Sequence, residues 1–186
     1  ILDWQPESGV ITTEPGVTIE ALWRTTILSG WWPPVVPGTM RPTIGGCAAM
    51  NIHGKNHWRS GSFGEHVLAF KALLPEGEVV RCSRTERPEL FRGMLGSFGM
   101  LGCFLSLTLQ LKRVQSGTVR VQAFTVATID HMLEVVEAHK EEAVAVATRG
   151  TVENMGGVCL RELGVEEGRD EQTVTQRAED GEARQR

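Results

Sequence analysis

The chain has 186 residues and a formal net charge of -4, with 41% hydrophobic and 23% charged residues. This length and composition fit one globular domain with a buried core, with room for a tail. The slightly acidic balance argues against a general nucleic-acid binder, because such proteins carry a basic excess. No apolar run approaches the roughly 18 residues of a membrane span and no signal peptide is visible, so we expect no transmembrane segment and leave the compartment open.

Strand and helix signals alternate in the first third of the chain. The opening "ILDWQPESGV" has no initiator Met and begins close to a strand, so we expect a sequence entered part-way. The β-rich centre at Val10–Thr13, between turn formers, predicts a strand. Thr18 can cap a helix that Gly30 would end, and "WWPPVVPGT" after it is too rich in proline for a helix. The apolar positions of that helix follow a helical period: Ile19, Leu22, Trp23 and Ile27.

The middle of the chain predicts a hairpin, a helix and two strands. Two apolar runs flank the turn formers Pro75-Glu76-Gly77, which is typical of a β-hairpin. "RPELFRGML" predicts a short helix with Pro88 in its first turn. "CFLSLTLQLKRV" and "GTVRVQAFTV" alternate like strands, and Thr128 then opens a helix. We expect that helix to bury one apolar face, made of Ile129, Met132, Leu133 and Val136. The fold class is therefore α+β.

The composition changes beyond about residue 142. From Arg161 to Arg186, eight acidic and five basic residues occur among 26, with almost nothing to bury. Such a segment cannot offset its ordering entropy, so we expect a disordered charged tail. We accordingly expect a folded domain over residues 1–142 and a linker with this tail over residues 143–186. The four cysteines form no CxxC pair, which favours reduced thiols: Cys47, Cys82, Cys103 and Cys159.

The stretch from Pro37 to His66 has an unusual composition. Its 30 residues include six glycines, three histidines and one acidic residue, and no acidic residue occurs between Glu20 and Glu65. Glycines let a backbone approach a ligand closely, and bare N–H groups form good anion sites. A region free of carboxylates also suits a pyrophosphate. The stretch therefore predicts a cradle for a large anionic cofactor, with a glycine-rich surface loop that binds nothing as the alternative.

The order of residues in this stretch resembles a known family. "PGTMRPTIGGCAAMNIHGKNHWRSGSFGEHV", a hairpin, "ELFRGMLGSFGMLGCF" and a strand together resemble FAD-linked oxidoreductases of the vanillyl-alcohol oxidase type. The likeness includes the sugar and polyol oxidase and decaprenylphosphoryl-ribose oxidase branches, and it covers residues 1–142. It implies a PCMH-type FAD-binding domain, of which this chain carries mainly the second subdomain. A mixed or antiparallel sheet flanked by helices would then hold FAD.

The resemblance also implies cofactor contacts residue by residue. Pro37, Gly38 and Thr39 would lie near the flavin end. Thr43, Gly45 and Gly46 would give backbone and hydroxyl contacts. Gly99, Gly102 and Phe104 would lie near the adenine half. The implied contacts are Pro37, Gly38, Thr39, Thr43, Gly45, Gly46, Ala49, Met50, Ile52, His53, Asn56, Gly99, Gly102 and Phe104.

His53 and Lys55 would stand nearest the chemistry, where Lys55 could offset an anionic reduced flavin or a polar substrate. The implied reaction is oxidation of a CH–OH group in a sugar-like or other alcohol substrate. The electron acceptor, the general base and the substrate stay open.

Two parts of the family pattern do not occur in this sequence. The glycine-rich pyrophosphate loop would lie upstream of Ile1, and the charged tail stands where a substrate-capping domain should follow. No residue matches the His or Cys that tethers FAD in some members, so we expect noncovalent binding. A truncated flavin-domain remnant without activity is therefore an alternative to an active oxidoreductase.

Two other motifs admit different interpretations. His53 and His57 stand four apart, as zinc ligands on one helix face do, but Gly54 and "SGSFG" make a continuous helix unfavourable. A zinc protein is thus a weaker alternative, beside ordinary loop histidines, and we predict no metal. The glycines of "GSFGMLG" follow a GxxGxxG spacing between a helix and a strand, whereas a dinucleotide fingerprint needs strand, turn and helix. A Rossmann fold is excluded.

Overall fold

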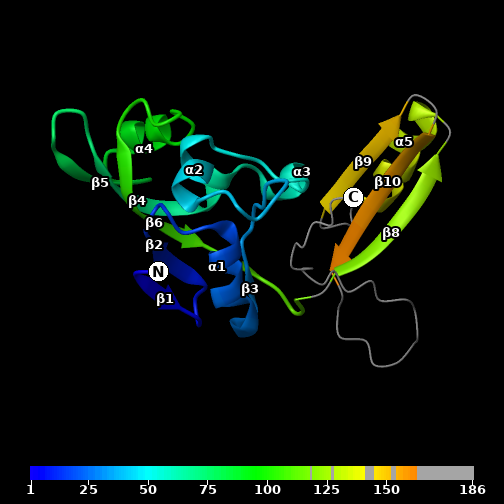
Figure 1. The fold of residues 1–186 in the computed structure, drawn as a ribbon, viewed down its shortest axis with the longest axis horizontal. Coiled ribbons are helices and arrows are strands. Elements are labelled where there is room, and N and C mark those ends of the chain that lie inside the picture. The colour runs from blue at the N-terminus through cyan, green and yellow to red at the C-terminus, as the bar shows by residue number, and fades with distance from the viewer. Residues whose placement is uncertain (118, 127, 141–144, 152–153, 163–186) are drawn as a thin grey trace, which may run out of the picture.

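The structure is a computed structural model that describes residues 1–117, 119–126, 128–140, 145–151 and 154–162. Its strands form a five-stranded sheet, a three-stranded sheet and a two-stranded ribbon (Figure 1). Among the described residues, no helix has the length and apolar character needed to cross a bilayer. The five-stranded sheet and its helices carry the residues of interest.

The five-stranded sheet is antiparallel throughout, in the order β1-β2-β6-β4-β5. The predicted strand at residues 10–13 and the predicted hairpin are confirmed; in the turn, Gly77 has a φ of +87°. The sequence predicted a mixed or antiparallel sheet, and the strand pairing shows that this sheet is antiparallel. The strands are β1 (Asp3–Gln5), β2 (Val10–Thr13), β4 (Val67–Leu73), β5 (Val79–Ser83) and β6 (Cys103–Gln110).

The predicted helices are present and are terminated as their sequences indicate. Helix α1 (Ile19–Thr26) begins where Thr18 Oγ1 accepts a hydrogen bond from the Ala21 amide, and a 3-10 turn, η1 (Ile27–Ser29), ends at Gly30 with a φ of +77°. Helix α4 (Pro88–Met94) starts at its proline. Two more helices and a turn lie in the glycine-rich stretch: α2 (Ile44–Ala49), α3 (His57–Ser60) and η2 (Phe63–His66).

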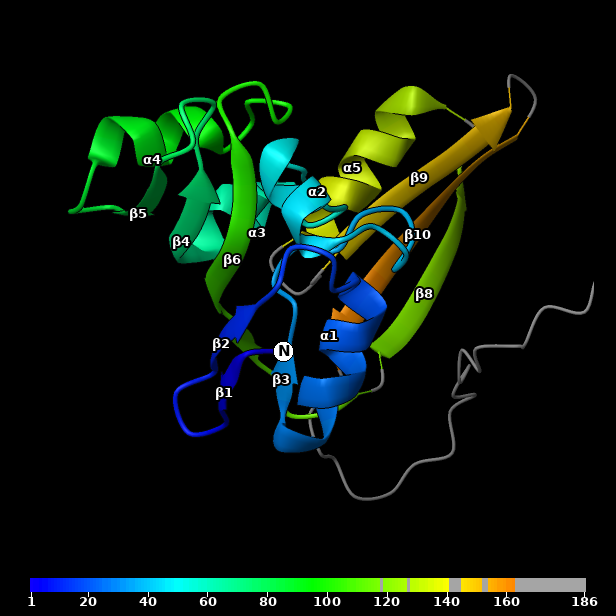
Figure 2. The ribbon, with the colours of Figure 1, turned by 60° about the vertical axis from the view of Figure 1, so that its left-hand side comes forward.

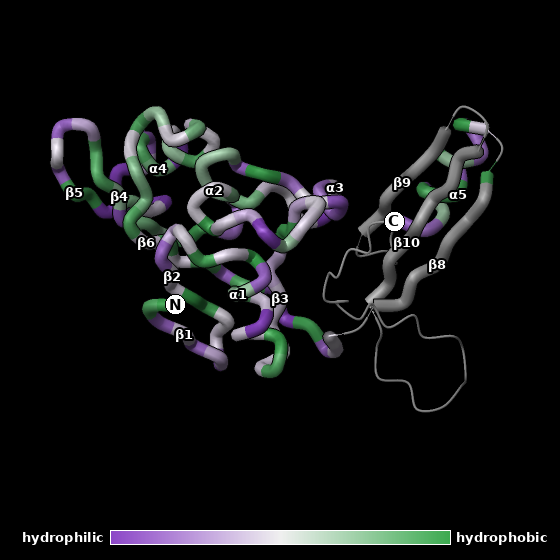
Figure 3. The backbone as a smooth tube through the Cα atoms, in the orientation of Figure 1, coloured by the Kyte–Doolittle hydropathy of each residue, from purple (hydrophilic) through white to green (hydrophobic). Residues whose placement is uncertain are grey.

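The core lies between the sheet and the helices. Helices α1 and α2 cover the same side of the sheet (Figure 2), and the ring of Phe70 on β4 stacks on Phe91 of α4 at 5.4 Å between centroids. Figure 3 shows apolar stretches along β2, β4 and β6, while α3 is strongly polar. The largest fully buried side chains are Phe63, Phe70, Phe91, Ile11, Ile19, Leu22, Ile44, Met94, Leu107, Leu109, Val35 and Val67.

A short ribbon closes one end of this unit. Strand β3 (Trp31–Trp32) pairs with β7 (Lys112–Arg113). The Trp31 ring lies on the backbone of Gly9, where a Cβ would come within 2.2 Å of it, and its Nε1 donates to the Pro6 carbonyl. Trp31 therefore has a structural role, since its ring packs at the edge of the core.

The second sheet differs from the expected linker. Strands β8 (Val119–Val126), β9 (Ala145–Thr151) and β10 (Asn154–Glu162) pair antiparallel in the order β8-β10-β9, with α5 (Ile129–His139) against β8 and β10. Two strands thus lie within the range 143–186. They were missed because β10 pairs with β8, a partner distant in sequence. Of the expected disordered tail at residues 161–186, Arg161 and Glu162 lie in β10, and residues 163–186 lie outside the described residues.

The face that α5 buries also differs from the prediction. Ile129 and Leu133 are 60% and 57% exposed, whereas Met132, Val135 and Val136 are half-buried. The predicted N-cap, Thr128, is confirmed, since its hydroxyl accepts from the His131 amide. The buried face is rotated toward Val135 because the position of the sheet decides which apolar residues are covered.

Candidate functional site

The glycine-rich stretch forms a continuous surface feature rather than a loose loop. It runs as irregular backbone from Pro37 to Pro42, enters α2, and then crosses to α3 and η2. A bridge between His53 and Ser62 ties the two ends of the second half together. The segment is thus held in place by the fold.

The amides at the start of α2 are used within the protein. The Ile44 amide donates to the Val17 carbonyl at 2.8 Å, the Gly45 amide to the Pro15 carbonyl at 2.9 Å, and the Gly46 amide to Thr43 Oγ1 at 3.2 Å. The prediction that Gly45 and Gly46 present unbonded amides to a ligand is therefore wrong, because both amides donate to acceptors within the protein. Packing explains the glycine at position 45 instead, since a Cβ there would come within 2.6 Å of the Pro15 Cβ.

Amides with no intramolecular acceptor among the described residues lie just upstream, from Gly38 to Arg41 and at Thr43. Gly38 and Thr39 are exposed, and a Cβ on Gly38 would meet no atom within 4 Å. Pro37 is half-buried beside them. An anionic group can approach this backbone closely, because no side chain blocks it and donors are available.

The end of α2 presents a mixed surface. Met50 is 50% exposed, and Ala49 and Ile52 are half-buried against the core. Asn51, which the sequence analysis did not single out, has a φ of 43°, and its Oδ1 accepts from the Gly64 amide at 2.8 Å. Asparagine tolerates this left-handed conformation, and its side chain joins α2 to η2.

Residues 53–57 gather polar side chains at an exposed turn. The rings of His53 and His57 lie 5.4 Å apart between centroids, and both residues and Lys55 are exposed. Asn56 Nδ2 donates to the Pro34 carbonyl at 2.9 Å and to Ser60 Oγ at 2.8 Å, so this amide holds the turn. Gly54 is buried, and a Cβ there would come within 2.9 Å of the Val36 carbonyl oxygen.

These histidines bear on the zinc alternative. Helix α3 begins only at His57, so the two residues do not share one helix face. Among the described residues, no group of three or more His, Cys, Asp or Glu side chains is arranged to hold a metal ion. The pair of rings is a local contact at the turn.

The second glycine cluster lies beside α2. The Gly96 amide donates to the Ala48 carbonyl at 3.1 Å and the Phe98 amide to the Ala49 carbonyl at 2.8 Å. Gly99 has open space, but Gly102 lies against the Leu73 carbonyl, 2.6 Å from where its Cβ would be. Phe104 is buried with its ring edge-on to Phe70. The structure therefore joins this cluster to α2 through Gly96 and Phe98, leaves Gly99 in open space, and places Gly102 and Phe104 in packing positions.

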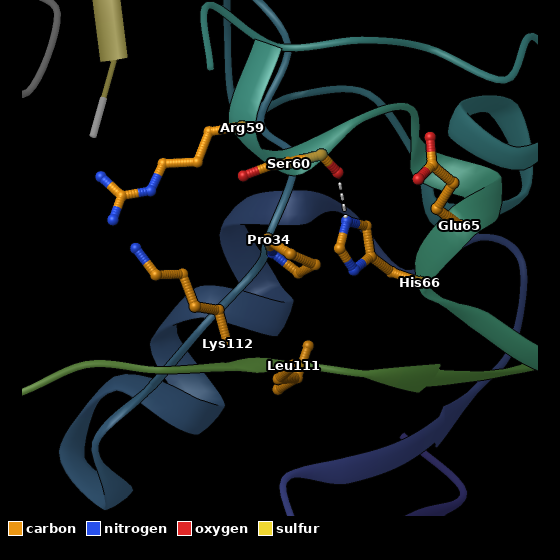
Figure 4. A pocket seen from close by; sticks show the side chains of 7 residues that line it. All are labelled: Pro34, Arg59, Ser60, Glu65, His66, Leu111 and Lys112. Atoms are coloured by element: carbon orange, nitrogen blue, oxygen red, sulfur yellow. Dashed lines mark hydrogen bonds between the residues drawn. The ribbon is translucent and has the colours of Figure 1, made fainter. Parts of the chain in front are cut away.

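A pocket of about 510 Å³ opens between α3, η2 and the β6–β7 junction (Figure 4). The sequence did not predict it, because the residues of the glycine-rich stretch that line it meet Pro34, Leu111 and Lys112 only in the folded chain. Its lining is Pro34, Arg59, Ser60, Glu65, His66, Leu111 and Lys112.

Comparison with known proteins gives one matching family and several relatives. Residues 1–83 match the family described as FAD binding domain. Over 103 residues the chain is 35% identical to decaprenylphosphoryl-beta-D-ribose oxidase of Mycolicibacterium smegmatis, covering 55% of this chain and 22% of that protein. Over 116 residues it is 31% identical to D-lactate dehydrogenase of Anaerostipes hadrus, covering 60% and 24%.

A third relative is Delta(24)-sterol reductase of Homo sapiens, 28% identical over 112 residues, which cover 60% of this chain and 22% of that protein. The chain thus spans about a quarter of the length of these curated relatives. The range matched by the family includes the stretch Pro37–His66. The match to the family described as FAD binding domain thus spans 83 of the 186 residues.

Proposed function

We propose that this chain is the cofactor-binding part of an FAD-dependent oxidoreductase that oxidises a CH–OH group of a sugar-like or other alcohol substrate. The observation that carries the proposal is the strip from Gly38 to Thr43, whose amides at residues 38–41 and 43 lack intramolecular acceptors among the described residues and whose own sequence contains no carboxylate. Bound FAD would supply the hydride acceptor, and the protein would orient it.

The residues of the strip fit such a group. The amides of Gly38, Thr39 and Thr43 would donate to its oxygens, and Met50 would cover an apolar part of it. Lys55 would place a positive charge beside the reacting region, where negative charge accumulates on reduction. His53 would orient the substrate hydroxyl or hold its proton. Gly99 would line the far end, whereas Gly45 and Phe104 would support the site from behind.

The names of the relatives bear on the substrate. One name contains a phosphoryl sugar and another contains lactate, so both refer to hydroxyl-bearing compounds. We propose an alcohol of this general kind for this protein. We also propose that residues 1–117 form the flavin-binding unit and that β8, α5, β9 and β10 begin a substrate-capping domain.

Titration of the purified chain with FAD tests the proposal. Saturable binding with a shift of the visible flavin spectrum is expected, together with bleaching of the flavin when an oxidisable alcohol is added without oxygen. Lys55→Gln should lower the bleaching rate and leave FAD uptake unchanged, and His53→Gln should also lower the bleaching rate. A folded chain that takes up no FAD would be a flavin-domain remnant, and the proposal would fail.

Gly46→Val gives a sharper test of where FAD lies. A Cβ at Gly46 would meet only Thr43 Oγ1, at 3.2 Å, so the protein itself has room for a side chain. We expect the variant to fold and to lose FAD uptake. Gly16→Val is the matched control, because Gly16 also has open space and lies outside the proposed contacts. Unaltered FAD titration of Gly46→Val would remove α2 from the site.

A further inference from the structure

Helix α2 ends in a motif in which an asparagine takes the position usual for glycine. Asn51 has a φ of 43°, and its amide donates to the Ala48 carbonyl at 3.1 Å. The Ile52 amide donates to the Cys47 carbonyl at 3.1 Å, which completes a Schellman motif. Glycine is the most common residue at this position, because a side chain strains the left-handed backbone. The side chain of Asn51 therefore supplies something that glycine would lack.

The side chain of Asn51 extends a backbone pairing by one residue. The Gly64 amide donates to Asn51 Oδ1 at 2.8 Å. The next pair along the two segments is joined by a 2.8 Å bond from the Phe63 amide to the Ile52 carbonyl, and the pair after it forms the β-bridge of His53. Three consecutive residues thus face three others in antiparallel order, and the carboxamide oxygen of Asn51 takes the place of a backbone carbonyl.

Two glycines leave room for this side chain. A Cβ on Gly64 would come within 2.9 Å of Asn51 Oδ1, and a Cβ on Gly96 would come within 3.3 Å of Asn51 Cβ. Gly64 is buried and Asn51 is half-buried, so the hydrogen bond between them lies largely out of water. A buried amide that loses its acceptor is not easily satisfied by solvent, and this contact therefore holds α2 and η2 firmly together.

The contact at Asn51 lies next to the turn that carries the proposed chemistry. His53 follows Asn51 by two positions, and its backbone continues the same pairing. At the other end of the turn, Asn56 Nδ2 donates to the Pro34 carbonyl at 2.9 Å. One carboxamide thus holds each end of the segment that presents His53 and Lys55, and loss of either would release its backbone.

From this arrangement we infer that Asn51 is a positioning residue of the proposed site. Its carboxamide fixes the register of residues 51–53 against residues 62–64, and so the direction in which His53 faces the substrate. A displacement of about 1 Å at a reacting group can lower a rate by about a hundredfold, so such a contact affects the reaction. The inference rests on the proposed function, because it takes His53 to act on the substrate hydroxyl.

Asn51→Gly isolates the contribution of the side chain, since glycine keeps the left-handed backbone and removes the acceptor. In the full chain without added cofactor, NMR should show exchange of the Gly64 amide accelerated by about tenfold or more. The ring signals of His53 should shift in the same variant. Asn51→Asp retains an acceptor and should restore both observables. Unchanged His53 signals in folded Asn51→Gly would overturn the inference.

Gln110→Ala is the matched control for a general loss of stability. Gln110 Nε2 donates to the Ser8 carbonyl at 2.9 Å, so this variant also loses a bond between a carboxamide and the backbone, at the end of β6. It should leave the His53 signals unchanged, and an equal shift there would overturn the inference. If circular dichroism shows that Asn51→Gly does not fold, Gly64→Ala decides instead, because its Cβ would displace Asn51 Oδ1.

Flavin measurements separate this inference from the proposed function. With FAD bound, Asn51→Gly should lower the bleaching rate at saturating alcohol by about tenfold or more, while the FAD dissociation constant changes by less than about threefold. If the chain takes up FAD and Asn51→Gly bleaches it at the parent rate, the inference fails and the proposed function stands. If the chain takes up no FAD, the proposed function fails, and the NMR signals of His53 still show whether Asn51 positions that residue.

Discussion

At the scale of single residues, adjacent glycines in α2 have different neighbours. Gly45 faces Pro15, with the Pro15 Cβ 2.6 Å from a Cβ built on Gly45, while Gly46 faces open space apart from Thr43 Oγ1. The local sequence "TIGGC" gives no signal that distinguishes the two glycines. Only their surroundings separate a packing glycine from one that leaves room for a ligand.

This difference predicts unequal effects of alanine on the free energy of unfolding. Gly45→Ala should lower the free energy of unfolding by about 1–3 kcal/mol, because Pro15 offers rigid ring and backbone atoms that cannot move aside. Gly46→Ala should change it by less than about 1 kcal/mol. Urea unfolding followed by tryptophan fluorescence measures both. Equal losses would show that the close contact of α2 with Pro15 is not as described.

The buried thiol of Cys47 predicts a pH dependence. Burial raises the pKa of Cys47 from 9.0 to about 11. Below pH 9 the thiol is protonated in both states, so its contribution to stability is fully present. As pH rises toward 11, the thiol ionises only in the unfolded chain, and stability falls by at most about 2–3 kcal/mol.

Urea unfolding at about pH 8 and about pH 10.5 checks this sign. Wild type should lose more stability between the two pH values than Cys47→Ala does. The comparison removes the contribution of Cys82, whose pKa is also raised by burial. A parallel loss in the two proteins would contradict the assignment to Cys47.

At the scale of elements, the short helix α2 depends on its cap. Thr43 Oγ1 accepts from the Gly46 amide, so Thr43→Ala should cost about 1 kcal/mol of stability, and Thr43→Ser should restore most of it. Thr39→Ala is the control, because Thr39 is exposed and its hydroxyl has no partner among the described residues; it should change stability by less than about 0.5 kcal/mol. Chemical denaturation of the three variants gives the comparison.

Elements defined by local signals were predictable from the sequence. Thr18, Thr128 and Gly30 mark helix ends because capping needs only neighbours within one turn. The buried face of α5 was not predictable in the same way. Ile129 and Leu133 fit an apolar stripe as well as Val135 does, and only the position of the sheet decides among them.

At the scale of the whole molecule, the core cluster formed by the residues whose burial the structure describes lies in the first unit, residues 1–117. Its core cluster runs from Trp4 to Leu111, and the second sheet uses β8, β9 and β10 alone. A chain ending after Ser116 should therefore keep a cooperative thermal transition within a few degrees of the full chain. Calorimetry measures this, and loss of the transition would mean that the first unit needs the second sheet in order to fold.

The sequence by itself determined the antiparallel hairpin, the caps of α1 and α5, the α+β class and the likeness of Pro37–His66 to FAD-binding proteins. These features follow from neighbours along the chain. Only the tertiary structure decided that the Gly45 amide bonds to Pro15, that Gly96 joins α2, and that Arg59 and Lys112 line one pocket. Each is a contact between segments far apart in sequence, and no local pattern specifies such a contact.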